Sequence, residues 1–256
     1  MNAPVLSLTG LGKDFEGKVA LRELSFDVRA GEVVFLLGPN GAGKTTAMRC
    51  ILGLLRPTRG TAYVLEHDCT RDPTRAKASL GYTQDEPVFY DFLTGGESLD
   101  FVLNTRGVER ASVEPWIKRL VEGLDFTRDL SSTTGGYSLG MRKKLALLLA
   151  MAHRPPLLLL DEPTNGLDPQ TAALVRDLLR EYAQGGGAVL VATHLLDMAE
   201  RLADRILVVD GGALVAQGTR AEILAAAGLD GERASIEDAF LRLVGKRARP
   251  MEPERA

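Results

Sequence analysis

The sequence predicts an α/β fold with a mostly parallel sheet, an antiparallel β part at the N-terminus and an inserted helical subdomain. Over the last third of the chain, apolar runs of strand length alternate with helical stretches, which is typical of a parallel sheet covered by helices on both faces. Between about residues 86 and 151 the pattern is helical instead, with Gly, Ser and Thr in the connecting segments. These two observations place a helical subdomain inside an α/β core.

The first elements are predicted to be short strands that lead into a helix. Strands are expected at 5–8, 24–28 and 33–38, because each is a short apolar or alternating run bounded by glycine or charge. A glycine-rich turn follows, and the helical run 47–55 comes next. A strand, a glycine-rich turn and a helix in this order form a phosphate-binding unit.

The later elements follow from the same periodicities. The helical subdomain is expected to contain helices at 97–106, 112–124 and 138–152. Fully apolar runs predict buried strands in the last third, at 157–162, 188–194 and 205–212. Amphipathic patterns predict helices between and after them, at 168–183, 195–203 and 235–244.

Length and composition are those of an ordinary globular protein. The 256 residues are 45% hydrophobic and 25% charged, and the formal net charge is −3. This length suggests one large domain, which we expect over residues 3–244, and the charged segment 245–256 is expected to be disordered. The charge balance excludes a strongly basic nucleic-acid coat, and the presence of only two cysteines excludes a disulfide scaffold.

No membrane-spanning or secretory segment is predicted. The longest apolar stretch, 145–160, is interrupted by a His-Arg-Pro-Pro run, whereas a spanning helix needs ~20 mostly apolar residues. The N-terminus lacks the basic region and long apolar core of a signal peptide. The isolated chain is therefore expected to be soluble, and any association with a membrane would depend on a partner.

The strongest motif is the glycine-rich loop 38–45, which matches the pattern GxxxxGK[ST] in full. Its residues, with the adjoining Thr46, are the expected nucleotide-binding set: Gly38, Pro39, Asn40, Gly41, Ala42, Gly43, Lys44, Thr45 and Thr46. The backbone N–H groups of such a loop wrap a triphosphate, and the helix after it points its positive end at the same anion. Lys44 is expected to reach the β- and γ-phosphates, and the Thr45 hydroxyl to bind Mg²⁺.

The second motif is the strand LLLLDE, which ends in two carboxylates. Ligands bind at the carboxyl ends of strands in open α/β sheets. Asp161 is placed to hold Mg²⁺ through water, and Glu162 to accept a proton from the water that attacks the γ-phosphate. Together the two motifs predict a nucleotide triphosphatase with ATP and Mg²⁺ as its cofactors.

The third signal is weaker. Ser138 opens the helix at 138–152, and a helix N-terminus with a serine hydroxyl can be either an anion site or a plain structural cap. His67 and His153 have no partners at metal-ligand spacing, and we assign them no metal role.

In combination these features resemble the ATP-binding cassette family. The resemblance extends over residues 3–244 and includes, in chain order, Phe15, the loop 38–46, Gln84, the signature-like 137–141, LLLLDE, 165–168 and His194. The segments YSLGM, LTGGESL and NGLDP are most similar to ATPase subunits of exporters whose membrane domains are a separate polypeptide. The signature departs from the family's LSGGQ, because Leu139 and Met141 replace a glycine and a glutamine.

The resemblance assigns roles within one copy of the chain. Phe15 would stack on the adenine, and Gln84 would touch Mg²⁺ or the attacking water and lie where the membrane partner docks. His194 would contact the γ-phosphate. Apart from the resemblance, Arg142, Lys143 and Lys144 follow the signature, and we expect them on a solvated helix face, with phosphate contact as the alternative.

The resemblance also implies partners. Ser138 and Gly140 would bind the γ-phosphate held by a second copy of the chain, or by a homologous ATPase subunit, and Asp168 would cross that interface. Permease subunits would recruit this ATPase to the cytoplasmic face of the membrane, most simply for export. The alternatives are an importer subunit and a soluble ATPase acting on nucleic acid or ribosomes; we expect no nucleic-acid partner, because the chain has neither a basic patch nor a heptad run.

Overall fold

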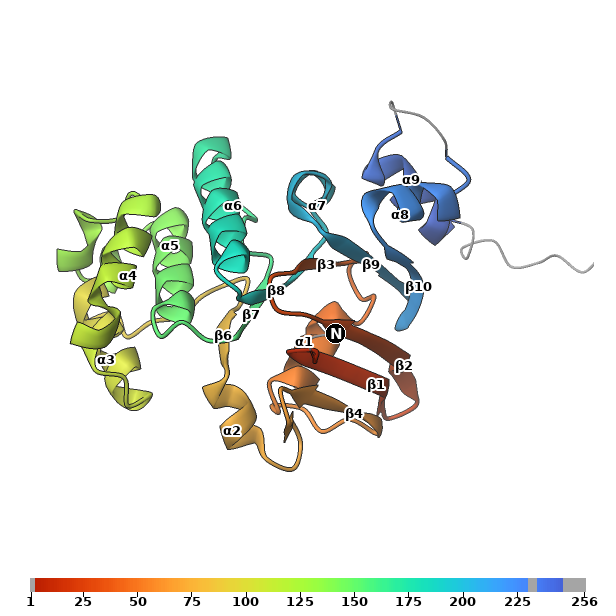
Figure 1. The fold of residues 1–256 in the computed structure, drawn as a ribbon, viewed down its shortest axis with the longest axis horizontal. Coiled ribbons are helices and arrows are strands. Elements are labelled where there is room, and N and C mark those ends of the chain that lie inside the picture. The colour runs from red at the N-terminus through yellow and green to blue at the C-terminus, as the bar shows by residue number, and fades with distance from the viewer. Residues whose placement is uncertain (1–2, 230–233, 246–256) are drawn as a thin grey trace, which may run out of the picture.

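The computed structural model describes residues 3–229 and 234–245. Beyond Gly245, the tail expected at 245–256 lies outside the described residues. The described strands form two sheets, one of six strands and one of four, with helices around them (Figure 1). Within this described part, no helix combines the length and apolar character needed to cross a membrane.

The six-stranded sheet confirms the mostly parallel architecture. Its strands, in sheet order, are β10 (Ala213–Gly218), β9 (Arg205–Asp210), β3 (Val33–Leu37), β8 (Ala188–Thr193), β7 (Leu157–Asp161) and β6 (Leu80–Thr83). Neighbouring strands pair in parallel except β10, which runs antiparallel to β9. Consequently β3, β6, β7 and β8 all end at the same edge of the sheet.

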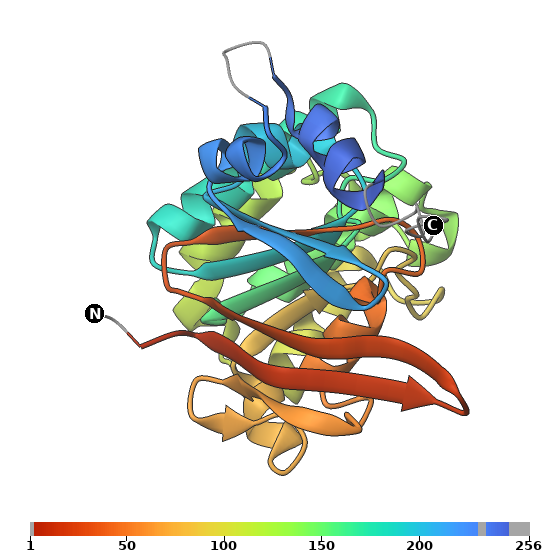
Figure 2. The ribbon, with the colours of Figure 1, turned by 90° about the vertical axis from the view of Figure 1, so that its right-hand side faces the viewer.

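The four-stranded sheet is the antiparallel β part expected at the N-terminus. Its order is β2 (Lys18–Val28), β1 (Leu6–Phe15), β4 (Arg59–Val64) and β5 (His67–Asp68). Figure 2 shows β1 and β2 as a layer below the parallel sheet. The predicted strands 5–8 and 24–28 are only the apolar parts of β1 and β2, because the other half of β2 carries exposed charged residues between its buried ones.

Both faces of the parallel sheet are covered. Side chains alternate along β3, so that Val33, Phe35 and Leu37 pack in one hydrophobic cluster, and Val34 and Leu36 in another. The first cluster lies under the helices of the middle and last thirds, and the second lies between the parallel sheet and the antiparallel one. This is why the predicted strands read as continuous apolar runs.

The helices agree with the predicted ones to within a few residues. They are α1 (Lys44–Ile51), α3 (Gly95–Thr105), α4 (Arg110–Gly123), α5 (Leu139–Met151), α6 (Pro169–Gln184), α7 (Leu196–Leu202) and α9 (Ile236–Gly245). Between β6 and β7 the described elements are all helical, as expected for 86–151, and they include the short turns η1 (Asp129–Ser131) and η2 (Thr134–Gly136). Two further helices were not predicted, α2 (Pro73–Ala78) and α8 (Arg220–Ala226).

Helix α5 packs directly on β6 at a glycine. A Cβ atom at Gly81 would lie 2.0 Å from the Ala150 carbonyl oxygen and 2.9 Å from Leu158 Cδ2. Both neighbours belong to packed elements, so neither can move aside cheaply. This close approach sets the distance between the helical subdomain and the sheet.

We therefore expect Gly81→Ala to destabilise the nucleotide-free protein. Overpacking of this kind costs about 1–3 kcal/mol, and in a chain of this size each kcal/mol lowers the melting temperature by roughly 2–4 °C. Differential scanning calorimetry measures the change. Gly136→Ala is the matched control, because a Cβ at Gly136 meets nothing within 4 Å. Equal melting temperatures for the two variants would contradict the packing account.

Candidate active site

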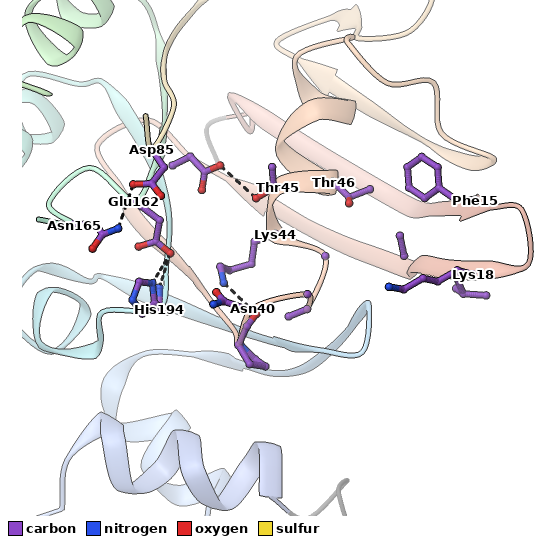
Figure 3. Close-up of a pocket in the computed structure, with 17 residues that line it drawn as sticks. Phe15, Lys18, Asn40, Lys44, Thr45, Thr46, Asp85, Glu162, Asn165 and His194 are labelled. Atoms are coloured by element: carbon purple, nitrogen blue, oxygen red, sulfur yellow. Dashed lines mark hydrogen bonds and ion pairs between the residues drawn. The ribbon is translucent and has the colours of Figure 1, made fainter. Parts of the chain in front are cut away.

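The carboxyl ends of the parallel strands open into a cavity of about 510 Å³ (Figure 3). Most of the predicted site residues line it: Phe15, Pro39, Asn40, Gly41, Ala42, Gly43, Lys44, Thr45, Thr46, Asp161, Glu162 and His194. The loop after β3, the end of β7 and the end of β8 supply the polar groups. Segments more than a hundred residues apart in the chain thus meet here because their strands are parallel neighbours.

Two glycines allow the loop to close around a phosphate. Gly43 precedes α1 with φ of 103°, a left-handed conformation, and a Cβ there would lie 2.6 Å from the Ala20 carbonyl oxygen. A Cβ at Gly38 would lie 2.4 Å from the Val209 carbonyl oxygen. The loop therefore fits only with hydrogen at these positions, and the first turn of α1 follows at once, with Lys44, Thr45 and Thr46 lining the cavity.

Lys44 is held within the loop that it follows. Its Nζ donates to the Gly38 carbonyl at 2.6 Å and to the Pro39 carbonyl at 3.3 Å. Burial lowers the pKa of Lys44, and the charges of Glu162 and Asp161 act in the opposite direction. Phosphate oxygens would be stronger acceptors for this ammonium than carbonyls, since charge-assisted hydrogen bonds are the stronger ones.

Asp161 and Thr45 form the oxygen pair expected for a metal. The Thr45 hydroxyl donates to Asp161 Oδ2 at 3.4 Å. Burial raises the pKa of Asp161, and the nearby charges of Glu162 and Asp85 raise it further, against smaller opposing effects of Thr45 and Lys44. A hydroxyl and a carboxylate are hard oxygen donors of the type that Mg²⁺ prefers, and a cation here would offset the gathered negative charge.

Glu162 is fixed by its neighbours on β8. The Thr193 hydroxyl donates to its Oε2 at 2.6 Å, and the His194 backbone N–H donates to its Oε1 at 3.0 Å. His194 Nδ1 lies 2.7 Å from the same Oε1. An ionised carboxylate has about four lone-pair positions, so these contacts orient Glu162 and leave acceptor capacity for a water molecule.

The backbone at Glu162 is unusual. Its φ is +47°, in the left-handed region that side-chain-bearing residues seldom adopt. Strained backbone of this kind persists where the surrounding structure holds it, and it concentrates at functional sites. The turn at Glu162 brings its side chain back toward β8.

Phe15 lies at the rim of the cavity. Its side chain is half exposed, and Lys13 Nζ lies 5.0 Å from the centre of its ring. A half-exposed ring beside the phosphate loop is compatible with stacking on a base, and adenine stacking stays a prediction.

Besides Gly38 and Gln84, three predicted residues do not line this cavity. Ser138 caps α5, its hydroxyl accepting from the Met141 N–H at 3.3 Å. Asp168 caps α6 and accepts from two backbone N–H groups at 3.0 Å. Gly140 lies in the first turn of α5. The structure thus shows the structural caps, while the predicted contacts of these residues with a second copy remain predictions.

Gln84 is not brought to the cavity either; its neighbour Asp85 lines the cavity instead. The Gln84 side chain donates to the Glu86 carbonyl at 2.8 Å and borders a different hollow. Both residues follow the end of β6, where the chain bends, so the packing of this bend decides which of the two side chains faces the nucleotide site. The sequence carries no signal that selects Asp85.

The expectation of a solvated face after the signature is wrong for Lys143. Only 4% of its side chain is exposed, and its Nζ lies 3.1 Å from Asp85 Oδ1 and 2.7 Å from the Glu162 carbonyl oxygen. Arg142 and Lys144 are partly exposed. Asn165, which was also missed as a lining residue, donates to Asp85 Oδ1 at 3.3 Å.

Comparisons with known proteins agree with this geometry. The family model described as ABC transporter matches residues 21–165. The chain is 40% identical to the uncharacterized ABC transporter ATP-binding protein YdbJ of Bacillus subtilis, over 85% of this chain and 70% of that protein. It is 36% identical to the daunorubicin/doxorubicin resistance ATP-binding protein DrrA of Streptomyces peucetius, over 94% of this chain and 73% of that protein.

A solved structure gives the same result. The ATP-binding subunit of an ABC transporter superposes with a TM-score of 0.88 at 31% identity, covering 93% of this chain and 99% of that one. The chain belongs to the ABC transporter family, as one of its ATP-binding subunits.

Proposed function

We propose that this ATPase subunit hydrolyses Mg²⁺-ATP between the phosphate loop and Glu162, and that hydrolysis drives export through a separately encoded permease. The observation that carries the proposal is the meeting of Lys44, Thr45, Asp161 and Glu162 in one cavity. These side chains supply an anion site, a metal site and a base at the edge of one sheet.

Each group has a separate role in the proposed reaction. The loop N–H groups and Lys44 bind the triphosphate, and Thr45 and Asp161 hold Mg²⁺. Magnesium, when bound, neutralises charge on the phosphate oxygens. Glu162 accepts the proton of the attacking water, and His194, which touches Glu162, stands beside the γ-phosphate.

Lys44→Ala tests the phosphate site. The substitution removes the fixed cation of the loop, so we expect turnover to fall below detection and ATP affinity to weaken by at least about tenfold, as for a lost charge-assisted contact. An ATPase assay and a nucleotide titration measure the two effects. Turnover at the parent rate would refute the proposed site.

The sandwich arrangement rests on the residues outside the cavity. Ser138 at the start of α5 and Asp168 at the start of α6 are exposed, Gly140 is partly exposed, and none of the three lines the chain's own nucleotide cavity. In the proposed dimer they close over the nucleotide of a second copy, where the α5 N-terminus adds an anion site. ATP would then hold two subunits together.

Glu162→Gln separates binding from chemistry. Loss of a general base typically costs ~10²–10⁴-fold in rate, while the groups that bind metal and phosphate are unchanged. We expect slow turnover, near-parent ATP affinity and an ATP-bound dimer that accumulates in gel filtration. Adding Ser138→Arg should return this variant to a monomer.

Asp161→Asn is the matched carboxylate control, and it should weaken Mg²⁺-dependent ATP binding itself. A Glu162→Gln variant that turns over at the parent rate, or an Asp161→Asn variant that traps the dimer in its place, would show that the two roles are exchanged.

An exposed apolar patch on the helical subdomain is the proposed permease contact. Val88, Tyr90, Phe92 and Phe101 are between 50% and 79% exposed. The rings of Tyr90 and Phe92 lie 5.8 Å apart, and those of Tyr90 and Phe101 5.9 Å. Exposed apolar patches of this kind mark interaction sites, and the similarity to the resistance protein DrrA favours export.

The double variant Phe92→Ser with Phe101→Ser tests this contact. In the native host, the tagged parent should sediment with the membranes, and the double variant should remain in the supernatant at parent ATPase activity. Leu241→Ser, at another exposed apolar position, is the control and should sediment like the parent. The assignment would be contradicted if the double variant sedimented fully with the membranes, or if the parent did not sediment with them at all.

A further inference from the structure

Among the described residues, the Lys143 ammonium is a buried cation that the reaction described above does not use. Its side chain is 4% exposed, and a buried charge is tolerated only when it is paired and hydrogen-bonded. The Glu162 carbonyl accepts from its Nζ at 2.7 Å, and Asp85 supplies the countercharge at 3.1 Å. Lys143 therefore belongs to the nucleotide site, although it does not line the cavity.

The contact with Glu162 falls where the backbone needs support. Glu162 has a φ of +47° and donates its N–H to the Ala192 carbonyl at 2.9 Å. Its carboxylate is held by Thr193 and His194, and its carbonyl by Lys143. Lys143 thus fixes the main chain of Glu162, and the residues at the end of β8 orient its side chain.

The contact with Asp85 reaches into the cavity. Asp85 Oδ1 accepts hydrogen bonds from the Lys143 ammonium and from the Asn165 side-chain amide. Among the described contacts, this leaves Oδ2 available to a ligand. The charge of Asp85 also acts on Asp161, the residue proposed for the metal. A bound cation attracts Asp85 and a bound phosphate repels it, so the strength of the Asp85–Lys143 pair depends on what the cavity holds.

Lys143 lies in the second turn of α5, and Ser138 is the N-cap residue just before that helix. Lys143 points to the chain's own carboxylates, while Ser138 caps the exposed end. A displacement of Asp85 would therefore act on α5, the helix whose N-terminus the proposed dimer uses.

We infer that Lys143 is a positioning residue for Glu162, and that its ion pair with Asp85 ties the position of α5 to the contents of the nucleotide cavity. The expected effect of Lys143 on hydrolysis rests on the proposed function. The ion pair itself is a property of the nucleotide-free chain.

The test is a double-mutant cycle of Lys143→Met and Asp85→Asn, with Lys143→Arg as the conservative variant. Lys144→Met is the matched control, because Lys144 is partly exposed and its Nζ contacts only the Asp125 carbonyl, at 3.4 Å, among the described contacts. Three quantities are measured: kcat, the dissociation constant of Mg²⁺-ATP by calorimetric titration, and the melting temperature without nucleotide.

We expect Lys143→Met to lower kcat by ~10–100-fold, as for a displaced catalytic group, and to change the dissociation constant by less than about threefold. Lys143→Arg should recover part of kcat. The double variant should be within about threefold of the slower single variant, because contacting residues are not additive. Lys144→Met should match the parent.

Other outcomes overturn the inference. A parent-like kcat in Lys143→Met with a lowered melting temperature would make Lys143 merely structural, and multiplied losses in the double variant would show that Asp85 and Lys143 act separately. Asp85→Asn changes a half-exposed side chain and so tests the pair even if Lys143→Met does not fold.

If the parent itself hydrolyses no ATP, the proposed function fails. Additive losses in melting temperature would then overturn the ion pair independently.

Discussion

The clustering of negative charge at the end of a parallel sheet is the constraint on which this structure depends. Parallel strands end at one edge, and here that edge carries Asp161, Glu162 and Asp85 within reach of each other's charge. Like charges gathered in a partly buried site are unfavourable without cations. Lys44 and Lys143 each offset part of this charge, the exposed Lys18 also lines the cavity, and a bound metal ion would offset the charge further.

This constraint explains why the helical subdomain joins the nucleotide site. Helix α5 is one rigid element that contacts β6 at Gly81 and carries Lys143 to the Glu162 carbonyl. Its first turn, capped by Ser138, remains exposed. The same helix therefore stands between the chain's own carboxylates and the surface proposed for a second copy, while the aromatic patch proposed for the permease lies on the segment that follows Asp85.

The parts of the site formed by short contiguous motifs could be predicted from the sequence, and the parts that tertiary packing brings together could not. The phosphate loop and LLLLDE are short motifs whose residues stay neighbours in the fold, so residue type and spacing were sufficient. Lys143 follows exposed signature residues, and only the packing of α5 against the sheet buries it. Asp85 was missed because the choice between it and Gln84 depends on how the bend after β6 packs.

The same distinction holds for the fold. Strands buried on both faces, such as β3 and β7, were predicted because their apolar runs are continuous. The edge strand β10 is mostly half-exposed and mixes small and polar residues, so it gave no strand signal. The charged half of β2 was missed for the same reason, since one of its faces is solvated.

The most direct test of the central claim is a structure of the chain with Mg²⁺ and a non-hydrolysable ATP analogue. The account predicts the γ-phosphate between Lys44 and Glu162, the metal on Thr45 and Asp161, and Asp85 still in contact with Lys143 or shifted together with α5. Phosphates that lie away from Glu162 would contradict the account. So would a movement of α5 in which Asp85 and Lys143 separate while Glu162 keeps its position.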